Sequence, residues 1–508
     1  MAGAGEIIIS NASGLSFRLQ SLYQSGDMCD IQINVGKKTF QAHKLILCAS
    51  SDVFKTMLTS VRWTEANKQS IVLVEDRSCE TIFDRFLHYI YSGELFVSHA
   101  TVGPLFILAD KYNIRDLIPL CRRYMLENLD APVDDLSVLQ WWQIANLHRD
   151  FELQEKTLSY IELNFSKVIQ TTDFLNANVH TLNILLSSSR IVIPNELMLF
   201  YGLKHWLEAY IECSCSSLTV RELKKVFKEL TRHIRWPMMT KDELEWLQED
   251  SDMQQFIATY RNFMYLPSPE DLELDSTDEP GISDPWCFVA EFTDRHCLNV
   301  EPRCSASPKS DLKKRKPRKI DNGICDKNRS AASRVYLSDH WSSSLTVSDF
   351  AAFPRYGTRT FFFSTPRTGF RRDTSTLDWE VEVHPKGVHF QPAILIGLER
   401  DGNKVVDETF VNTVRVSVMS RSPAELPVKV EVNILVQASS PSNPDCLYIE
   451  RCRRQVCIFD SSSSRHNLDD IVPQENMGVY LQPDVHFPGL AVSPTLAFSL
   501  GIVIRPID

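Results

Sequence analysis

The sequence predicts a multidomain protein whose fold class changes twice: an α+β domain, then an all-α domain, then an all-β sandwich. Near the N-terminus, short segments of alternating apolar residues precede helical patterns. Between Leu129 and Leu266, apolar residues recur at helical spacing throughout, which indicates a helical bundle. After Trp286, many short alternating segments are separated by turn residues, a pattern typical of a β-sandwich. A chain of 508 residues is long enough for about three such domains.

The first domain is organised around the stretch from Asp30 to Leu58. Apolar residues alternate from Ile31 to Val35, which predicts a strand, and Gly36 then begins a hairpin turn. The nearly apolar run Ala42–Ala49 predicts a buried helix. An amphipathic helix follows, with Val53, Phe54, Met57 and Leu58 at helical spacing.

The same stretch resembles the core of a BTB/POZ domain, in the pattern D-I-x-I-x-V-x-x-x-x-F-x-A-H-K-L-I-L over its first half. Later segments, FDRFLHYIYSGEL and LADKYNIRDLIPLCRRYM, resemble the same family. We therefore expect an N-terminal tail at residues 1–11 and a BTB/POZ domain at residues 12–127. In this family an N-terminal helix packs against its twin. The resemblance thus implies a homodimer, with the interface on the amphipathic helix that carries Leu15, Leu19, Leu22 and Tyr23.

Residues 128–266 resemble a BACK domain, the helical module that usually follows a BTB domain. The likeness rests on LNILLSSSRIVIPNELMLFYGLKHWLEAY and on HIRWPMMTKDEL. Residues 267–285 form an acidic linker with seven acidic residues, no basic residue and four prolines. That composition cannot bury enough apolar surface to fold alone.

Residues 286–508 resemble a TRAF/MATH-type β-sandwich, with a basic insertion near 305–332. Alternation is clear in WEVEV and VRVSVM, and Leu447–Ile449 and Gln455–Phe459 are predicted as separate strands. Kelch repeats, which often follow BTB and BACK domains, are not expected, because the chain has no Gly-Gly pair and no period of about 50 residues.

Trp63-Thr64-Glu65 is the sharpest functional candidate. BTB proteins that bind cullin-3 carry a hydrophobic-x-Glu motif in the loop at this place. An exposed aromatic side chain can anchor in an apolar pocket while the carboxylate fixes its orientation. The resemblance implies a cullin-binding surface made of Trp63, Thr64 and Glu65 with Phe54, Met57 and Leu58, which the first BACK helices around Leu136–Leu147 would extend. The plainer interpretation is that Trp63 covers the domain's own core and Glu65 is solvated.

Asp30 and Lys44 match the paired acid and base near the dimer interface of BTB domains. A structural ion pair is the favoured interpretation over a functional pocket. His43, inside an apolar segment, is expected to be a hydrogen-bonded core histidine.

Composition sets limits on partners and compartment. The net charge of −11 disfavours nonspecific nucleic-acid binding, and no apolar run is long enough to span a membrane. The 13 scattered cysteines without a CxxC motif indicate a reducing compartment and no zinc site. One basic run resembles a nuclear localisation signal: Lys313, Lys314, Arg315, Lys316, Arg318 and Lys319. The predicted location is the cytoplasm, with the nucleus as the alternative.

No catalytic motif is found, and no cofactor is expected. The leading hypothesis is a non-enzymatic adaptor of a cullin-3 RING ubiquitin ligase, dimerised by its BTB domain and binding a protein substrate through its sandwich. The alternative is a BTB-dimerised scaffold that engages no cullin. The substrate itself, and whether the sandwich keeps a peptide groove, stay open at this point.

Overall fold

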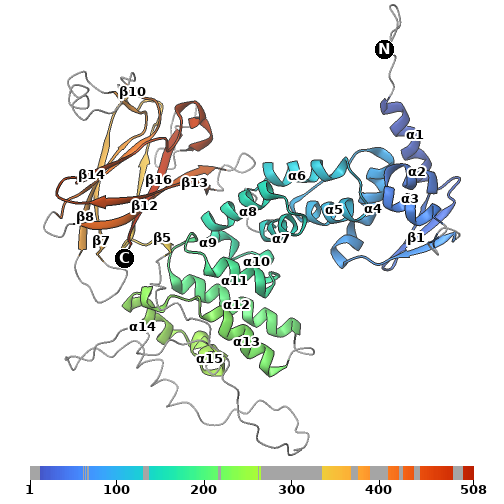
Figure 1. Cartoon of the computed structure of the whole chain (residues 1–508), viewed down its shortest axis with the longest axis horizontal. Coiled ribbons are helices and arrows are strands. Elements are labelled where there is room, and N and C mark those ends of the chain that lie inside the picture. The colour runs from blue at the N-terminus through green and yellow to red at the C-terminus, as the bar shows by residue number, and fades with distance from the viewer. Residues whose placement is uncertain are drawn as a thin grey trace, which may run out of the picture. The chain divides into compact units, whose positions relative to one another are not determined.

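A computed structural model gives the fold of the chain in two compact units (Figure 1). It describes residues 12–60, 62, 65, 68–129, 137–214, 219–260, 263–264, 334–367, 376–389, 410–422, 427–439, 447–483 and 496–507. The first unit comprises Met1–Ile161 with Thr171–Asp173, and the second comprises Glu162–Gln170 with Phe174–Asp508.

The first unit is a small sheet covered by helices. Its strands are β1 (Ile31–Val35), β2 (Lys38–Ala42) and β3 (Ser70–Leu73), in the order β2-β1-β3. Strands β1 and β2 form the predicted antiparallel hairpin, while β3 lies parallel to β1. The helices are α1 (Ala12–Ser25), α2 (Lys44–Ser50), α3 (Asp52–Thr59), α4 (Arg77–Ser92), α5 (His99–Lys111), α6 (Leu117–Glu127), α7 (Val138–His148) and α8 (Phe151–Leu163), of which α8 continues into the second unit.

Packed aromatic rings hold this unit together. Phe54 stacks on Tyr112 with ring centroids 4.5 Å apart, and Phe83 and Phe86 pack against the same tyrosine. The hairpin turn needs a glycine at position 36, since φ is +55° and a Cβ atom there would lie 2.5 Å from a carboxylate oxygen of Glu80.

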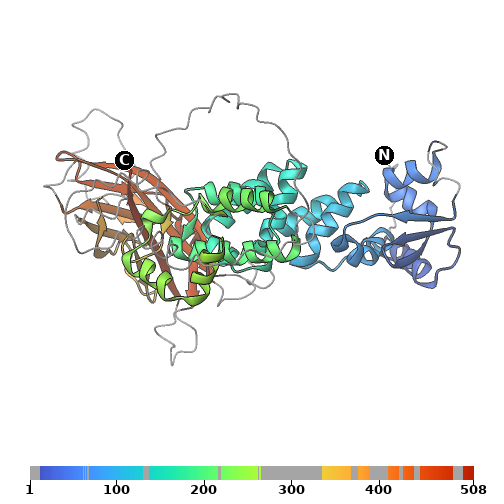
Figure 2. The ribbon, with the colours of Figure 1, turned by 90° about the horizontal axis from the view of Figure 1, so that it is seen from below.

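The helical part of the second unit continues the predicted bundle. It contains α9 (Phe165–Val168), α10 (Thr172–Leu175), α11 (Val179–Ser187), α12 (Glu196–Ser214), α13 (Val220–Thr231), the 3₁₀ helix η3 (Trp236–Met238), α14 (Lys241–Glu249) and α15 (Ser251–Tyr260). Figure 1 shows helices α11, α12 and α13 alongside one another, and α13 contacts both of the others; Figure 2 shows the same green helices turned by 90°. The expectation of helix throughout was wrong at one place, because Val192–Ile193 forms a short strand, β4.

The rest of the second unit is a β-sandwich, as predicted. The strands in this part of the chain are β5 (Val335–Tyr336), β6 (Ser342–Val347), β7 (Arg359–Pro366), β8 (Thr376–His384), β9 (Val388–His389), β10 (Phe410–Val411), β11 (Arg415–Ser420), β12 (Val428–Ser439), β13 (Leu447–Phe459), β14 (Arg465–Leu468), β15 (Leu481–Pro483) and β16 (Leu496–Pro506), with the 3₁₀ helix η8 (Gln474–Tyr480). Strand β5 pairs with β4 of the helical part, and β9 pairs with β10. One sheet has the order β14-β11-β8-β7. The other has the order β13-β12-β16-β15, and β6 also pairs with β16.

The core of the sandwich lies between the two sheets. The predicted alternation of WEVEV places Trp379, Val381 and Val383 inside, against Val430, Val432 and other inward residues of the second sheet. The indole N–H of Trp379 donates to the Thr365 hydroxyl at 2.8 Å, so this large buried side chain has its polar atom satisfied. The segments 447–449 and 455–459, predicted as two strands, belong to the single strand β13.

Candidate partner-binding surfaces

Helix α3 positions the loop that carries the predicted cullin motif. Its N-terminus is capped by Ser51, whose hydroxyl accepts the N–H of Phe54 at 3.0 Å and donates to the carbonyl of Tyr112 at 2.5 Å. Phe54 is fully buried and Leu58 nearly so. These two residues therefore do not themselves reach a partner, contrary to their place in the predicted contact surface. They fix α3 in the core.

The residues of α3 that reach the surface are fewer than predicted. Met57 is half-buried, and Val53 is 37% exposed. In the loop that follows, Glu65 is half-buried and its carboxylate lies 3.8 Å from the Lys68 ammonium. Trp63 and Thr64 lie outside the described residues. The contact with a cullin thus stays a prediction, which rests on Met57 and on the motif Trp63-Thr64-Glu65.

Helix α7 presents a second apolar surface. Its N-terminus is held by the Asp173 carboxylate, which accepts the N–H groups of Leu139 (2.7 Å) and Gln140 (3.3 Å). Burial raises the pKa of Asp173 to about 6, although these two hydrogen bonds oppose the rise. Leu147, at the far end of α7, and Phe151, at the start of α8, are each 76% exposed. Leu136 lies outside the described residues.

Helix α1 has one face on its own domain and one face uncovered. The ring of Tyr23 stacks on that of Tyr91 at 4.5 Å, so this residue packs inward. Leu19 and Leu22 are half-buried, while Leu15 and Phe17 are 53% and 69% exposed. Of the predicted dimer residues, Leu15 is the most available to a second copy, and Phe17 was not in the predicted set.

Asp30 contacts Lys44 through the backbone. The Asp30 carboxylate accepts the N–H of Lys44 at 2.7 Å, where Lys44 is the first residue of α2. The acid therefore satisfies a free donor at the start of a helix, which favours the structural interpretation. His43 is buried as predicted: its Nε2–H donates to the Asp27 carbonyl at 2.7 Å, and its Nδ1 accepts from the Tyr91 hydroxyl at 2.9 Å.

The sandwich offers one long edge strand with exposed aromatic surface. Strand β7 pairs with β8 and stands at one end of the four-stranded sheet. It carries three consecutive phenylalanines, of which Phe362 is 66% exposed. A separate polar cavity of about 300 Å³ is lined by Arg355, Tyr356, Lys386, Asn412, Gln474 and Glu475. The Lys386 ammonium is already bound to the carbonyls of Ala351 and Phe353.

Comparison with protein families assigns three domains. Residues 19–129 match the BTB/POZ domain, residues 138–249 match the domain described as "BTB And C-terminal Kelch", and residues 331–508 match the BTBD17 TRAF domain. The chain contains a BTB, a BACK and a TRAF domain. All three domain types expected from the sequence are confirmed, and modules of these types are typically non-enzymatic adaptors.

The chain is similar to several curated proteins over part of its length. The chain is 27% identical over 311 residues to BTB/POZ domain-containing protein 17 of Xenopus laevis, covering 60% of each chain. It is 30% identical over 249 residues to the protein of that name from Mus musculus, covering 48% of each. Human Kelch-like protein 28 is 26% identical over 222 residues, 44% of this chain and 36% of that one. The chain thus matches about half of the length of these curated relatives. The solved BTB domain of zebrafish PATZ1 aligns with 24% of this chain and 98% of its own length, at 18% identity and a TM-score of 0.20.

On the BTB domain, several exposed apolar residues were missed by the sequence interpretation. Val72, Val74 and Phe96 are 73%, 83% and 94% exposed. Alternation alone could have found Val72 and Val74, because they occupy the outward positions after the buried Ile71 and Leu73.

The basic run 313–319 lies outside the described residues. No helix in the described part of the chain is long and apolar enough to cross a membrane, and no three potential metal ligands converge there.

Proposed function

We propose that the chain recruits protein substrates to a cullin-3 RING E3 ubiquitin ligase. The BTB domain forms a homodimer and binds the cullin through the loop between α3 and β3, and the TRAF domain binds the substrate. The observation that carries the proposal is the combination of a BTB, a BACK and a TRAF domain in one chain, with Trp63-Thr64-Glu65 directly after α3. The similarity to Kelch-like and Kelch–BTB proteins adds support.

The local structure suits such a contact. Phe54 and Leu58 anchor α3 in the core, so the loop begins from a rigid element. A rigid base lowers the entropy that is lost when an exposed side chain docks into a pocket. The exposed Leu147 and Phe151 give the first BACK helices apolar area with which to enlarge the contact. The chain itself positions a substrate and performs no bond chemistry.

Substrate binding is assigned to the edge strand β7. In this proposal, the backbone groups of β7 on the side away from β8 pair with an extended peptide, and the exposed Phe362 supplies apolar area beside them. Two TRAF domains in one dimer would bind two segments of the same substrate with increased avidity.

The test is a binding titration of the full-length protein with the N-terminal region of cullin-3. The wild type is compared with the double variant Trp63→Ala/Glu65→Ala. A matched control is Glu94→Ala/Phe96→Ala, which removes an acidic and an aromatic side chain, both exposed, at the same spacing elsewhere in the BTB domain. Loss of a central anchor costs about 2 kcal/mol or more, so the dissociation constant should rise at least ~30-fold.

Light scattering on each variant reports whether the dimer is intact. Tight binding by the wild type and by the control, with loss in the Trp63/Glu65 variant, supports the adaptor. A wild-type dimer that does not bind the cullin overturns it. In that case the scaffold without a cullin becomes the better account, and the partners of the TRAF domain become the question.

A further inference from the structure

The C-terminal end of helix α11 is contacted by three arginines of the TRAF part of the chain. The Arg334 guanidinium donates to the carbonyl of Ser188 at 2.6 Å, and that of Arg505 donates to the carbonyl of Ser189 at 3.3 Å. Arg454 donates to the next carbonyl, that of Arg190, at 2.9 Å. Three consecutive carbonyls after one helix thus each bind a guanidinium. Helix α11 ends at Ser187, so the carbonyl of the C-cap Ser188 belongs to the helix end, whereas those of Ser189 and Arg190 lie just beyond it. The last carbonyls of a helix lack partners within it and carry partial negative charge, which favours a cation at Ser188.

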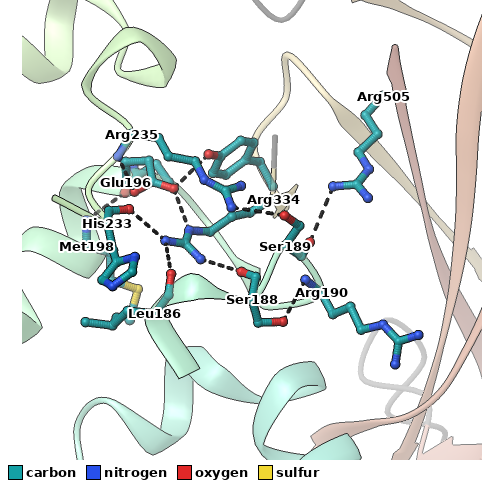
Figure 3. A network of polar contacts seen from close by, with 12 residues as sticks. Leu186, Ser188, Ser189, Arg190, Glu196, Met198, His233, Arg235, Arg334 and Arg505 are labelled. Atoms are coloured by element: carbon teal, nitrogen blue, oxygen red, sulfur yellow. Dashed lines mark hydrogen bonds and ion pairs between the residues drawn. The ribbon is translucent and has the colours of Figure 1, made fainter. Parts of the chain in front are cut away.

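Arg334 is the most deeply placed of the three, and Figure 3 shows its contacts. Its side chain is fully buried. Besides Ser188, it donates to the carbonyls of Leu186 (2.8 Å) and His233 (2.9 Å) and to the Glu196 carboxylate (2.8 Å). A buried guanidinium is tolerated only if its donors are paired, and here each of its three nitrogens has an acceptor.

Glu196, at the start of α12, is the counterion of this site and is also fully buried. One of its oxygens accepts from Arg334 and from the hydroxyl of Tyr336 at 2.7 Å, and the other accepts the N–H of Arg235 at 3.1 Å. Arg235 lies beside this pair as well. Burial, with repulsion from Arg334, lowers the pKa of Arg235 to about 10.

The segment that carries Arg334 also adds a strand to the BACK domain. Val335 and Tyr336 form β5, which lies parallel to β4. The N–H of Val335 donates to the carbonyl of Ile191 at 3.2 Å, and the N–H of Leu337 donates to that of Ile193 at 2.8 Å. Val192, Ile193, Val335 and Tyr336 are all buried. In sequence, this segment is separated from Met264, in the helical part, by residues 265–333. Its position on the BACK domain is therefore set by these contacts and not by closeness in the sequence.

A second set of contacts involves the five-stranded sheet of the sandwich. Asn164 uses its side-chain amide as a strand would, accepting the N–H of Ile449 at 2.8 Å and donating to its carbonyl at 3.0 Å. Asn433, Leu435 and Val503 point away from the sandwich core and are nevertheless almost completely buried. The part of this face around these three residues is therefore covered and not available to solvent.

We propose that the carbonyl end of α11, together with β4 and Glu196, is a docking site for the TRAF domain, which inserts Arg334 and the strand Val335–Tyr336 into it. The site recognises an arginine followed by a short extended apolar segment. It holds the TRAF domain on the BACK domain in one orientation, so that residues 265–333 are not needed to keep the two together. This docking is independent of whether a cullin binds.

The experiment cuts the covalent connection in the full-length protein. A specific protease sequence is inserted after Pro280, the purified protein is cleaved, and the association of the two pieces is measured by size-exclusion chromatography and by a binding titration after separation. The wild-type pieces should stay together. In Arg334→Ala, the buried Glu196 loses the guanidinium with which it forms its ion pair, and the dissociation constant should rise at least ~100-fold.

Three further variants make the result specific. Arg453→Ala removes an exposed arginine from the same strand as Arg454 and should leave the association unchanged. Arg334→Lys keeps the charge but cannot reach all four acceptors and should also weaken association. Tyr336→Phe removes the hydroxyl that donates to Glu196 and should weaken association roughly tenfold. This milder variant tests the same site if Arg334→Ala does not fold. The proposal is overturned if the wild-type pieces separate after cleavage, or if the Arg334 and Tyr336 variants associate as tightly as Arg453→Ala.

Discussion

Replacing Glu196 by alanine tests the buried network through stability rather than association. Both partners of the Glu196–Arg334 pair have side chains that are 0% exposed, at 2.8 Å. Removing the carboxylate leaves the guanidinium of Arg334 and the hydroxyl of Tyr336 buried without their acceptor. Breaking a buried ion pair on one side costs about 3–5 kcal/mol.

The assay is thermal unfolding of the full-length protein, followed by calorimetry. For a unit of this size, each kcal/mol shifts the midpoint by about 2–4 °C, so the transition of the second unit should fall by roughly 6–20 °C. The control is Glu208→Ala, which removes a 40% exposed carboxylate from Lys204 while Asp252 remains as a partner of that lysine. Its midpoint should change little, because solvent screens the exposed carboxylate and the buried Lys204 keeps its ion pair with Asp252. A Glu196→Ala midpoint equal to that of Glu208→Ala would refute the argument that the network is stabilising.

Three other perturbations follow from the structure. Gly36→Ala should destabilise the BTB domain by more than about 1 kcal/mol, measured by urea unfolding, because of the positive φ and the contact with Glu80. Burial raises the pKa of Asp173 to about 6 in the folded state, so the native protein binds more protons than the unfolded chain between about pH 4 and 6. The contribution of Asp173 to stability is therefore present at low pH and is lost as the pH rises through about 6, a dependence that Asp173→Asn should remove from unfolding curves recorded across this range. If the basic run acts in nuclear import, Lys314→Ala/Arg315→Ala should lower the nuclear fraction of a fluorescent fusion, and an unchanged fraction would assign the run to another role.

Where the sequence pattern is periodic, it predicted the fold correctly. Alternation from Trp379 to Val383 placed the same residues in the core that the structure buries, and the hairpin before α2 has the predicted turn at Gly36. Helix α2 was predicted to be buried, yet Leu45 is 77% exposed. An apolar residue on a short helix can face outward, since not all of a protein's apolar side chains can be buried.

The features that the sequence did not predict depend on contacts between residues far apart in the chain. Strand β4 has two residues, too few for any periodicity, and its partner lies more than 140 positions away in the sequence. That partner, β5, falls within Arg334–Leu337, a segment that the sequence predicts as a strand. Strand β13 was divided in two because Arg451, Arg453 and Arg454 interrupt its apolar pattern, which an edge strand tolerates. The strand predicted at Arg334–Leu337 did not indicate that Arg334 itself is buried, because a charged side chain is expected at the surface. Its acceptors are set only by the fold.

The candidate site was located by resemblance to a family more than by the chemistry of single residues. Trp63-Thr64-Glu65 is a short pattern, and its meaning depends on its place after α3. Burial then showed which neighbours of the motif are core and which are surface: Phe54 and Leu58 belong to the core, while Met57 is half-exposed. The spacing of apolar residues shows which of them share one face of a helix, but it does not distinguish a core position from an interface position.

The most direct test of the adaptor is the composition of the complex in solution. Full-length protein is mixed with an excess of the cullin-3 N-terminal region, and the molar mass of the eluting species is measured by size-exclusion chromatography with light scattering. The account predicts one species that contains two copies of the chain and two of the cullin fragment. A dimer of the chain that elutes without cullin, or a monomer, would contradict it.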